Sequence, residues 1–139
     1  MIRIKAVDHI VLRTVRVKEM IDFYCDVLGC TLERTLPEEI GLSQLRAGEA
    51  LIDIVSVDSE LGRQGGDPPS ATGNNMDHFC LQIDPFAENE LLHYLADHSI
   101  DHSGFETRYG AQGFGPSVYI KDPDGNTVEL RASIHPSDP

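Results

Sequence analysis

The sequence predicts an α+β fold made of two βαβββ modules with curved mixed sheets. The first observation is an internal repeat, because the strand-like residues 7–13 (VDHIVLR) have a counterpart in residues 76–82 (MDHFCLQ). The second is that a helical pattern of apolar residues follows each of these segments. The third is that three further strand-like runs follow each helical pattern, which gives both halves the same order of elements.

The two helices are predicted from apolar residues that recur on one helical face. In the first half Gly29 is placed to end the helix, and the face consists of Met20, Ile21, Tyr24, Val27 and Leu28. In the second half Asp84 is predicted as the N-cap, with Pro85 at the first helical position. A weaker apolar stripe follows there, formed by Phe86, Leu91, Leu92 and Leu95.

Strand-like runs complete each half and are separated by turn signals. They lie at residues 31–35, 42–45 and 50–57 in the first half, and at 103–107, 117–121 and 127–132 in the second. The clearest turn is DPDGN at residues 122–126. The glycine-rich residues 108–115 (RYGAQGFG) are interpreted as a flexible connection or a substrate-gating loop.

These elements define one domain over residues 1–139. The first module occupies about 5–57, a Gly-, Pro-, Ser- and Asp-rich linker 58–75, and the second module about 76–133. A module of about 70 residues is marginal as an independent core, so we expect the two to pack together. Their sheets would then form a cup.

Composition narrows the possible partners. The formal net charge of −12 and the pI near 4.7 disfavour nucleic acid and anionic membranes, which leaves a small-molecule substrate. Three cysteines without CxxC spacing are typical of reduced cytosolic thiols. The first residues have no apolar region of a signal peptide, so we expect a cytoplasmic protein.

Each half offers one histidine and one acid that point to a metal site. His9 and His78 stand at the start of the first strand of each half, whereas Asp53 and Glu129 lie within apolar last strands. A carboxylate in an apolar strand is costly unless it is solvated, paired or bound to a metal. A pseudo-twofold relation between the halves would bring the four side chains together. Two imidazoles and two carboxylates suit one divalent ion such as Ni²⁺, Zn²⁺, Co²⁺, Mn²⁺ or Fe²⁺.

The chain resembles the vicinal oxygen chelate superfamily, which includes glyoxalase I, extradiol dioxygenases and bleomycin-resistance proteins. The segments that carry the resemblance are DHIVLRT (8–14), FYCDVLG (23–29), ALIDIVSV (50–57), DHFCLQI (77–83) and YIKDPDGNTVEL (119–130). The resemblance implies His9, His78 and Glu129 as metal ligands, and Asp53 stands where glyoxalase I has a fourth ligand, a glutamate. Arg13 matches an arginine that glyoxalase I uses to bind substrate. Family members commonly form homodimers, and the modules can pair across the dimer.

The function predicted on this basis is that of a metal-dependent, glyoxalase-like lyase or isomerase. It would act on a small vicinal-oxygen substrate through an enediolate or oxyanion held on the metal, with Glu129 or Asp53 as the base. If Asp53 faces solvent on an edge strand instead, three ligands remain. They would suit an Fe²⁺ extradiol-type dioxygenase or a fosfomycin-type thiol transferase. A non-catalytic drug-binding protein is the alternative of another class, and the presence of all four candidate ligands disfavours it.

The other residues on these strands have ordinary explanations. Arg13 can pair with one of the many acids of the surface instead of a substrate. Cys80 is predicted to be a small buried hydrophobic residue. Tyr24 and Leu28 are predicted to belong to the core.

Overall fold

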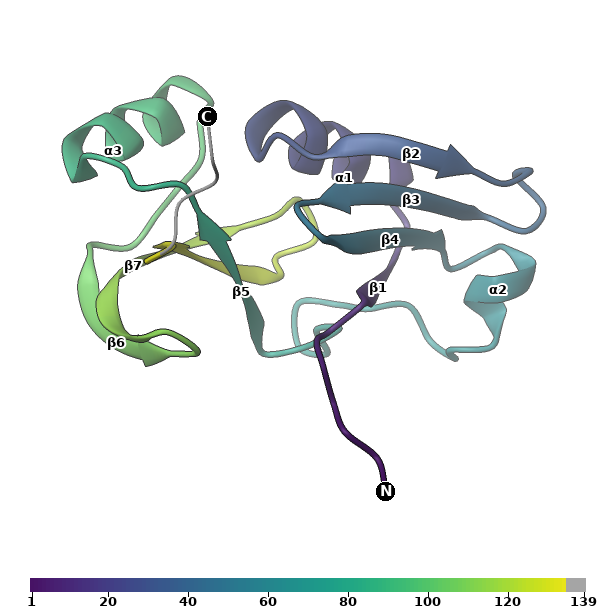
Figure 1. Cartoon of the computed structure of the whole chain (residues 1–139). Helices are drawn as coiled ribbons and strands as arrows, with labels where there is room; N and C mark the ends of the chain where they lie inside the picture. The colour runs from purple at the N-terminus through teal and green to yellow at the C-terminus, as the bar shows by residue number, and fades with distance from the viewer. Residues whose placement is uncertain (135–139) are drawn as a thin grey trace. The chain divides into compact units, whose positions relative to one another are not determined.

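A computed structural model describes residues 1–134, so the last five residues of the predicted domain lie outside the described part. The chain divides into two compact units, Met1–Asn75 (unit 1) and Met76–Pro139 (unit 2). Each unit contains one four-stranded mixed sheet (Figure 1). The division falls where the second module was predicted to begin. The predicted cup involves both units together and stays a prediction.

Unit 1 has the predicted βαβββ order. Its sheet runs β1-β4-β3-β2, with β1 parallel to β4 and the other pairs antiparallel. The elements in chain order are β1 (His9–Thr14), α1 (Val17–Asp22), a π-helical turn (Phe23–Val27), β2 (Thr31–Thr35), β3 (Leu42–Ala47), β4 (Ala50–Ser56) and α2 (Glu60–Arg63).

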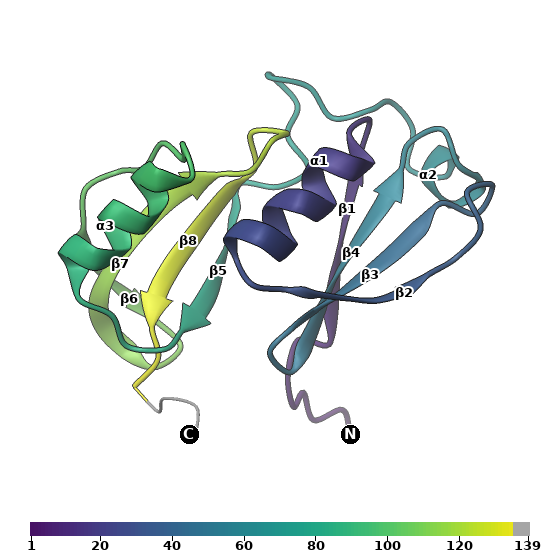
Figure 2. The same ribbon diagram turned by 90° about the horizontal axis from the view of Figure 1, so that it is seen from above.

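The helical segment of unit 1 packs on the sheet as the apolar pattern predicts. Met20 and Tyr24 are fully buried, as are Leu12 and Ile54 of the sheet. Figure 2 shows α1 lying alongside the sheet of unit 1, where it packs against β4. The predicted continuous helix is instead an α-helix that changes to a π-helical turn at Phe23. Gly29 follows with φ +78°, a left-handed conformation that favours glycine and ends the helical segment.

Unit 2 repeats this topology. Its sheet runs β5-β8-β7-β6, again with one parallel pair, β5 with β8. Its elements are β5 (His78–Ile83), α3 (Glu88–Asp97), β6 (Glu106–Gly110), β7 (Gly113–Lys121) and β8 (Thr127–Ala132). The helix α3 lies over one face of the sheet (Figure 2). The side chains buried in this unit's apolar core are Leu95, Val118, Ile120, Val128 and Leu130.

Three predicted elements of unit 2 differ from the structure. The strand predicted at residues 103–107 is β6, which begins and ends three residues later. The helix begins at Glu88 rather than Pro85, because Ala87 is still extended and the ring of Phe86 packs 5.6 Å from that of Phe105 before the helix starts. The glycine-rich residues 108–115 do not form a loop. They form most of the β6–β7 hairpin, in which Gly110 pairs with Gly113.

The predicted linker is partly structured. It contains the short helix α2, whose N-cap Ser59 accepts a hydrogen bond of 3.0 Å from the backbone N–H of Gly62. Within residues 1–134, no helix has the length and apolar character needed to cross a membrane.

Candidate functional site

Each unit places one histidine and one acid on the same face of two adjacent parallel strands. In unit 1, His9 is opposite Leu51 and Val11 is opposite Asp53. In unit 2, His78 is opposite Thr127 and Cys80 is opposite Glu129. Side chains two residues apart on a strand share a face, so in both units the acid lies one step diagonally from the histidine. The repeat seen in the sequence is therefore also a repeat of side-chain placement.

Asp53 lies on β4, which is an inner strand between β1 and β3. The residue is only 4% exposed, and both of its carboxylate oxygens lie 3.3 Å from the side-chain amide nitrogen of Gln44. The alternative of a solvent-facing aspartate on an edge strand is therefore wrong. Burial of a carboxylate with one long amide contact leaves strong demand for a further positive partner.

Glu129 occupies the equivalent inner strand of unit 2 and is 6% exposed. Its Oε1 lies 3.5 Å from Nε2 of His78. Cys80 is exposed, contrary to the prediction of a buried hydrophobic residue, because it lies on the polar face of β5 beside Glu129. Partial desolvation, followed by the charge and hydrogen bond of Glu129, raises the pKa of the Cys80 thiol to about 12.

In both units the aspartate that precedes the histidine orients its imidazole ring. The Nδ1–H of His9 donates to Asp8 at 2.7 Å, and the Nδ1–H of His78 donates to Asp77 at 2.5 Å. The hydrogen bond to Asp8, which outweighs desolvation, raises the pKa of His9, and the charge of Asp53 adds to the effect. A ring that donates through Nδ1 presents the lone pair of Nε2 to a metal. The Asp-His pair was visible in the sequence, but its orienting role was missed.

The donor set fits a first-row divalent ion. Neutral imidazole nitrogens and carboxylate oxygens are ligands such ions accept, and two buried carboxylates need compensating positive charge. His9 and Asp53 belong to unit 1, whereas His78 and Glu129 belong to unit 2. Among residues 1–134 no group of three or more His, Cys, Asp or Glu side chains is placed to hold a metal. The complete four-ligand centre therefore stays a prediction.

Arg13 is engaged by the linker instead of by an acid. Its guanidinium donates to the backbone carbonyls of Gly62, Gly65, Gly66 and Asp67 at 2.6–3.1 Å. A Cβ added at Gly65 would lie 2.3 Å from Nε of Arg13, so this position accepts only glycine without a shift. These contacts give Arg13 a structural role in unit 1. Its predicted role in substrate binding stays a prediction.

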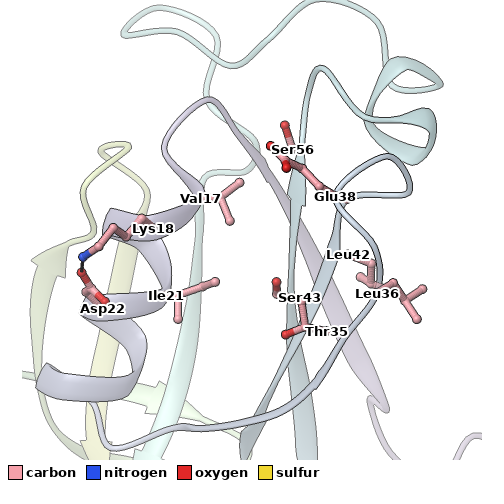
Figure 3. A pocket seen from close by; sticks show the side chains of 11 residues that line it. Val17, Lys18, Ile21, Asp22, Thr35, Leu36, Glu38, Leu42, Ser43 and Ser56 are labelled. Atoms are coloured by element: carbon pink, nitrogen blue, oxygen red, sulfur yellow. Dashed lines mark hydrogen bonds and ion pairs between the residues drawn. The ribbon is translucent and has the colours of Figure 1, made fainter.

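Unit 1 also contains two cavities. One of about 390 Å³ adjoins the face of β1 that carries the candidate ligand, and it is lined by Val11, Arg13 and linker residues 67–69 and 73–75. The other, of about 440 Å³, lies between α1 and the strand ends (Figure 3). Ser43 and Ile21 both line the second cavity, and Ser43 is opposite the core residue Ile54. Only the first cavity is therefore next to the candidate ligands of unit 1.

In unit 2 the histidine and acid are bordered by an aromatic ring and a cation. Tyr119 is opposite Glu129 on β7, and its ring lies 5.5 Å from that of His78 in an edge-to-face arrangement. The guanidinium of Arg108 covers the Tyr119 ring at 4.1 Å from its centroid. Sequence reasoning missed both residues. Alternation along the predicted strand 117–121 places Tyr119 on one face, but only strand pairing shows that Glu129 shares it.

Comparisons with known proteins bear on the fold and the family of the chain. Residues 6–130 match the family model described as Glyoxalase/Bleomycin resistance protein/Dioxygenase superfamily. A virulence protein from Salmonella typhimurium is similar in structure, with 25% identity over 96% of this chain and 100% of that one, and a TM-score of 0.76. No curated protein sequence matches the chain at a significant level.

Two further solved structures have the same fold. A lactoylglutathione lyase from Agrobacterium tumefaciens has 23% identity, covers 92% of this chain and 93% of its own, and has a TM-score of 0.66. The fosfomycin resistance protein from Mesorhizobium loti has 14% identity, covers 94% of each chain, and has a TM-score of 0.65.

Proposed function

Because the chain belongs to the Glyoxalase/Bleomycin resistance protein/Dioxygenase superfamily, we propose that it is a metal-dependent lyase or isomerase of the glyoxalase type. The substrate in this proposal is a small molecule with oxygens on two adjacent carbons. The observation that carries it is the repeated set of an aspartate, the histidine it orients, and a buried acid on the next strand. The likeness in fold to a lactoylglutathione lyase is in keeping with this activity.

We propose that His9, Asp53, His78 and Glu129 hold one divalent ion, with Ni²⁺, Zn²⁺, Co²⁺, Mn²⁺ and Fe²⁺ as candidates. Superfamily members typically use such an ion. When bound, it supplies Lewis-acid polarisation of the substrate oxygens. Asp8 and Asp77 support the set because they fix both imidazole rings with Nε2 available.

Glu129 is the stronger candidate for the base. It has one methylene more than Asp53 and no amide that contacts both oxygens, so its carboxylate has more freedom to approach a substrate carbon. In an isomerisation, one Glu129 oxygen accepts the proton of a carbon that carries an oxygen, and returns it to the adjacent carbon. The proton is conserved in this cycle, and no oxidant or reductant is required.

The assembly and compartment belong to the same proposal. We call His9 with Asp53 in unit 1, and His78 with Glu129 in unit 2, the two half-sites. Because they lie on separate units, the modules could pair within one chain or across a homodimer. We favour the homodimer by analogy with the superfamily. Light scattering combined with size-exclusion chromatography tests this arrangement. We propose a cytoplasmic location from the cysteine usage of the sequence.

Metal content tests the proposal directly. The full chain is purified without a metal-affinity tag, and its bound metals are measured by elemental analysis in the wild type, His78→Ala and Asp53→Asn. Glu33→Gln is the matched control, because Glu33 is a half-exposed acid of unit 1 that pairs with Arg46. Near-stoichiometric metal that is lost in both site variants supports a four-ligand lyase or isomerase.

The other outcomes favour the alternative functions. Metal that is lost in His78→Ala but retained in Asp53→Asn would favour the three-ligand dioxygenase or thiol transferase alternatives. A wild type that takes up none of the five ions when they are supplied would overturn the proposal in favour of the drug-binding alternative.

A further inference from the structure

A buried arginine lies beside the candidate acid of unit 2. Arg131 follows Glu129 by two residues on β8, so the two side chains share a face of the sheet, with their Cα atoms about 7 Å apart. Arg131 is only 4% exposed. Its neighbours across the strands are Gln82 and Ser117, which carry no charge. Neither the metal proposal nor the resemblance gives this residue a role.

The guanidinium of Arg131 has no anionic partner among residues 1–134. Its hydrogen bonds both come from Nη2, to the carbonyls of Gly113 at 2.8 Å and Arg108 at 3.5 Å. The described part of the chain shows no ion pair for it and no hydrogen bond from Nε or Nη1. A buried guanidinium charge is costly without an anion, and a planar fork with free N–H groups is well suited to bind one.

The glycines of the β6–β7 hairpin make the space that this guanidinium occupies. A Cβ added at Gly110 would lie 2.0 Å from Nη1 of Arg131, and one added at Gly115 would lie 3.1 Å from Nη2. Any side chain at Gly110 would therefore displace the arginine. The glycine-rich segment, which sequence analysis interpreted as a loop, serves to accommodate a cation on the sheet.

A second cation lies on the same sheet. Arg108 stacks on Tyr119, and its Nη1 donates to the carbonyl and hydroxyl of Ser117. Its carboxylate partner is Glu106 at 3.2 Å, whose side chain is 74% exposed, so this ion pair is open to water and weak. Ser117 is thus contacted by Arg108 and is opposite Arg131, so two arginines lie close together on this sheet in a protein of net charge −12.

We propose that Arg131 binds an oxyanion of the substrate, a carboxylate or a phosphate-type group, while Glu129 faces its vicinal oxygens. The inference deepens the proposed function and rests on it. The short distance between Glu129 and Arg131 along β8 means that the anionic group and the reacting oxygens belong to one small molecule and lie a few bonds apart. The substrate class is therefore a small oxygenated acid rather than a neutral carbonyl compound.

Arg131 also stabilises the hairpin, since it donates to two of its carbonyls, and the test must separate the two roles. The full-length chain, labelled with ¹⁵N and treated with a chelator so that no metal binds the probe, is titrated with inorganic phosphate and separately with acetate. The Nε–Hε signal of Arg131 is followed, and Arg131→Lys identifies it by its absence. Arg131→Met tests the charge, and Arg46→Gln removes a half-exposed arginine of unit 1 as the matched control.

We expect at least one probe to shift the Arg131 signal in a saturable manner. Loss of a charge-assisted hydrogen bond weakens binding by about tenfold or more. We therefore expect this loss in Arg131→Met, where the backbone amide of Gly113, a neighbour of Arg131, is followed in place of the missing side-chain signal. The affinity of Arg46→Gln should stay within about twofold of the wild type. The probe that binds identifies the carboxylate or the phosphate-type substrate. If neither probe moves the signal in the wild type, the inference is overturned, whether or not Arg131→Met folds.

Elemental analysis of the same preparation before chelation separates the two proposals. Metal binding without an effect of either anion on Arg131 would overturn this inference and leave the proposed function intact. A shift of the Arg131 signal by an anion, in a chain that takes up no metal, would overturn the proposed function. It would support an anion-binding site that does not depend on a metal.

Discussion

The two half-sites share a backbone arrangement but differ in the side chains around it. Asp53 of unit 1 has Val11 and Gln44 opposite it on the neighbouring strands. Glu129 of unit 2 has Cys80 and Tyr119 in the same two positions. Two residues further along the strand, unit 1 has Val55 where unit 2 has Arg131.

The difference shows how a duplicated unit can separate two tasks. Strand pairing fixes where the histidine and acid lie, so both units retain a potential pair of metal ligands. The flanking positions are not fixed by pairing, and only those of unit 2 combine an aromatic ring with two arginines. We infer that unit 2 recognises the substrate, whereas unit 1 contributes ligands and an apolar wall.

Removal of a ligand should have the largest effect and should differ between the units. We expect Glu129→Gln to weaken metal binding by more than about 100-fold, because it removes a charged ligand from an environment that is already desolvated. Asp53→Asn should weaken metal binding less than Glu129→Gln, since the aspartate has a shorter reach and contacts Gln44. Competition with a chromophoric chelator measures both affinities. Equal losses would show that the two half-sites ligate equally.

The two arginines offer the next comparison. Arg13 donates four hydrogen bonds to linker carbonyls, so Arg13→Met should lower the free energy of unfolding by about 2 kcal/mol and make residues 62–67 more sensitive to proteases. Urea denaturation and limited proteolysis measure the two effects. Anion binding at Arg131 should not change in this variant. A loss of anion binding in Arg13→Met would contradict the division of tasks between the units.

The aspartates that orient the histidines should have similar effects in the two units. Asp8→Asn and Asp77→Asn should each lower metal affinity by about tenfold, because the imidazole loses its fixed orientation and basicity while the ligand itself remains. Isothermal titration with Zn²⁺ measures this change. Asp58→Asn, on the exposed start of the linker, is the control. If only one of the two variants is affected, the corresponding half-site is the one that ligates.

The cysteines give the smallest and most local comparison. Burial raises the pKa of Cys30 in unit 1 to about 11, so at pH 8 only about one thiol in a thousand is ionised. Cys80 has a pKa of about 12, partly because of Glu129. Alkylation of both should be slow at pH 8 and accelerate as the pH rises towards these values. In the metal-free chain, Glu129→Gln should accelerate the alkylation of Cys80 severalfold and leave that of Cys30 unchanged. Peptide mass spectrometry measures both rates.

Much of the fold could be predicted because it depends on local pattern. The strand at residues 127–132 was predicted with its observed bounds, and the repeat gave the common topology of the two sheets, which the superfamily match confirms. Errors occurred where tertiary contacts override local signals. Pro85 was a plausible start for a helix, but Phe86 packs against Phe105 and delays it. Glycines at 110 and 115 suggested a loop, although Gly110 instead leaves room for Arg131, whose Nη1 would lie 2.0 Å from a Cβ at that position.

The sequence by itself determined the candidate metal ligands, since alternation along each strand places His9, Asp53, His78 and Glu129 on defined faces. It could not determine what surrounds them. Strand register and burial depend on pairings between residues far apart in the chain. They alone placed Tyr119 beside His78 and left the guanidinium of Arg131 buried without a carboxylate partner among residues 1–134. They also directed Arg13 to the linker, because backbone carbonyls as partners have no sequence signature.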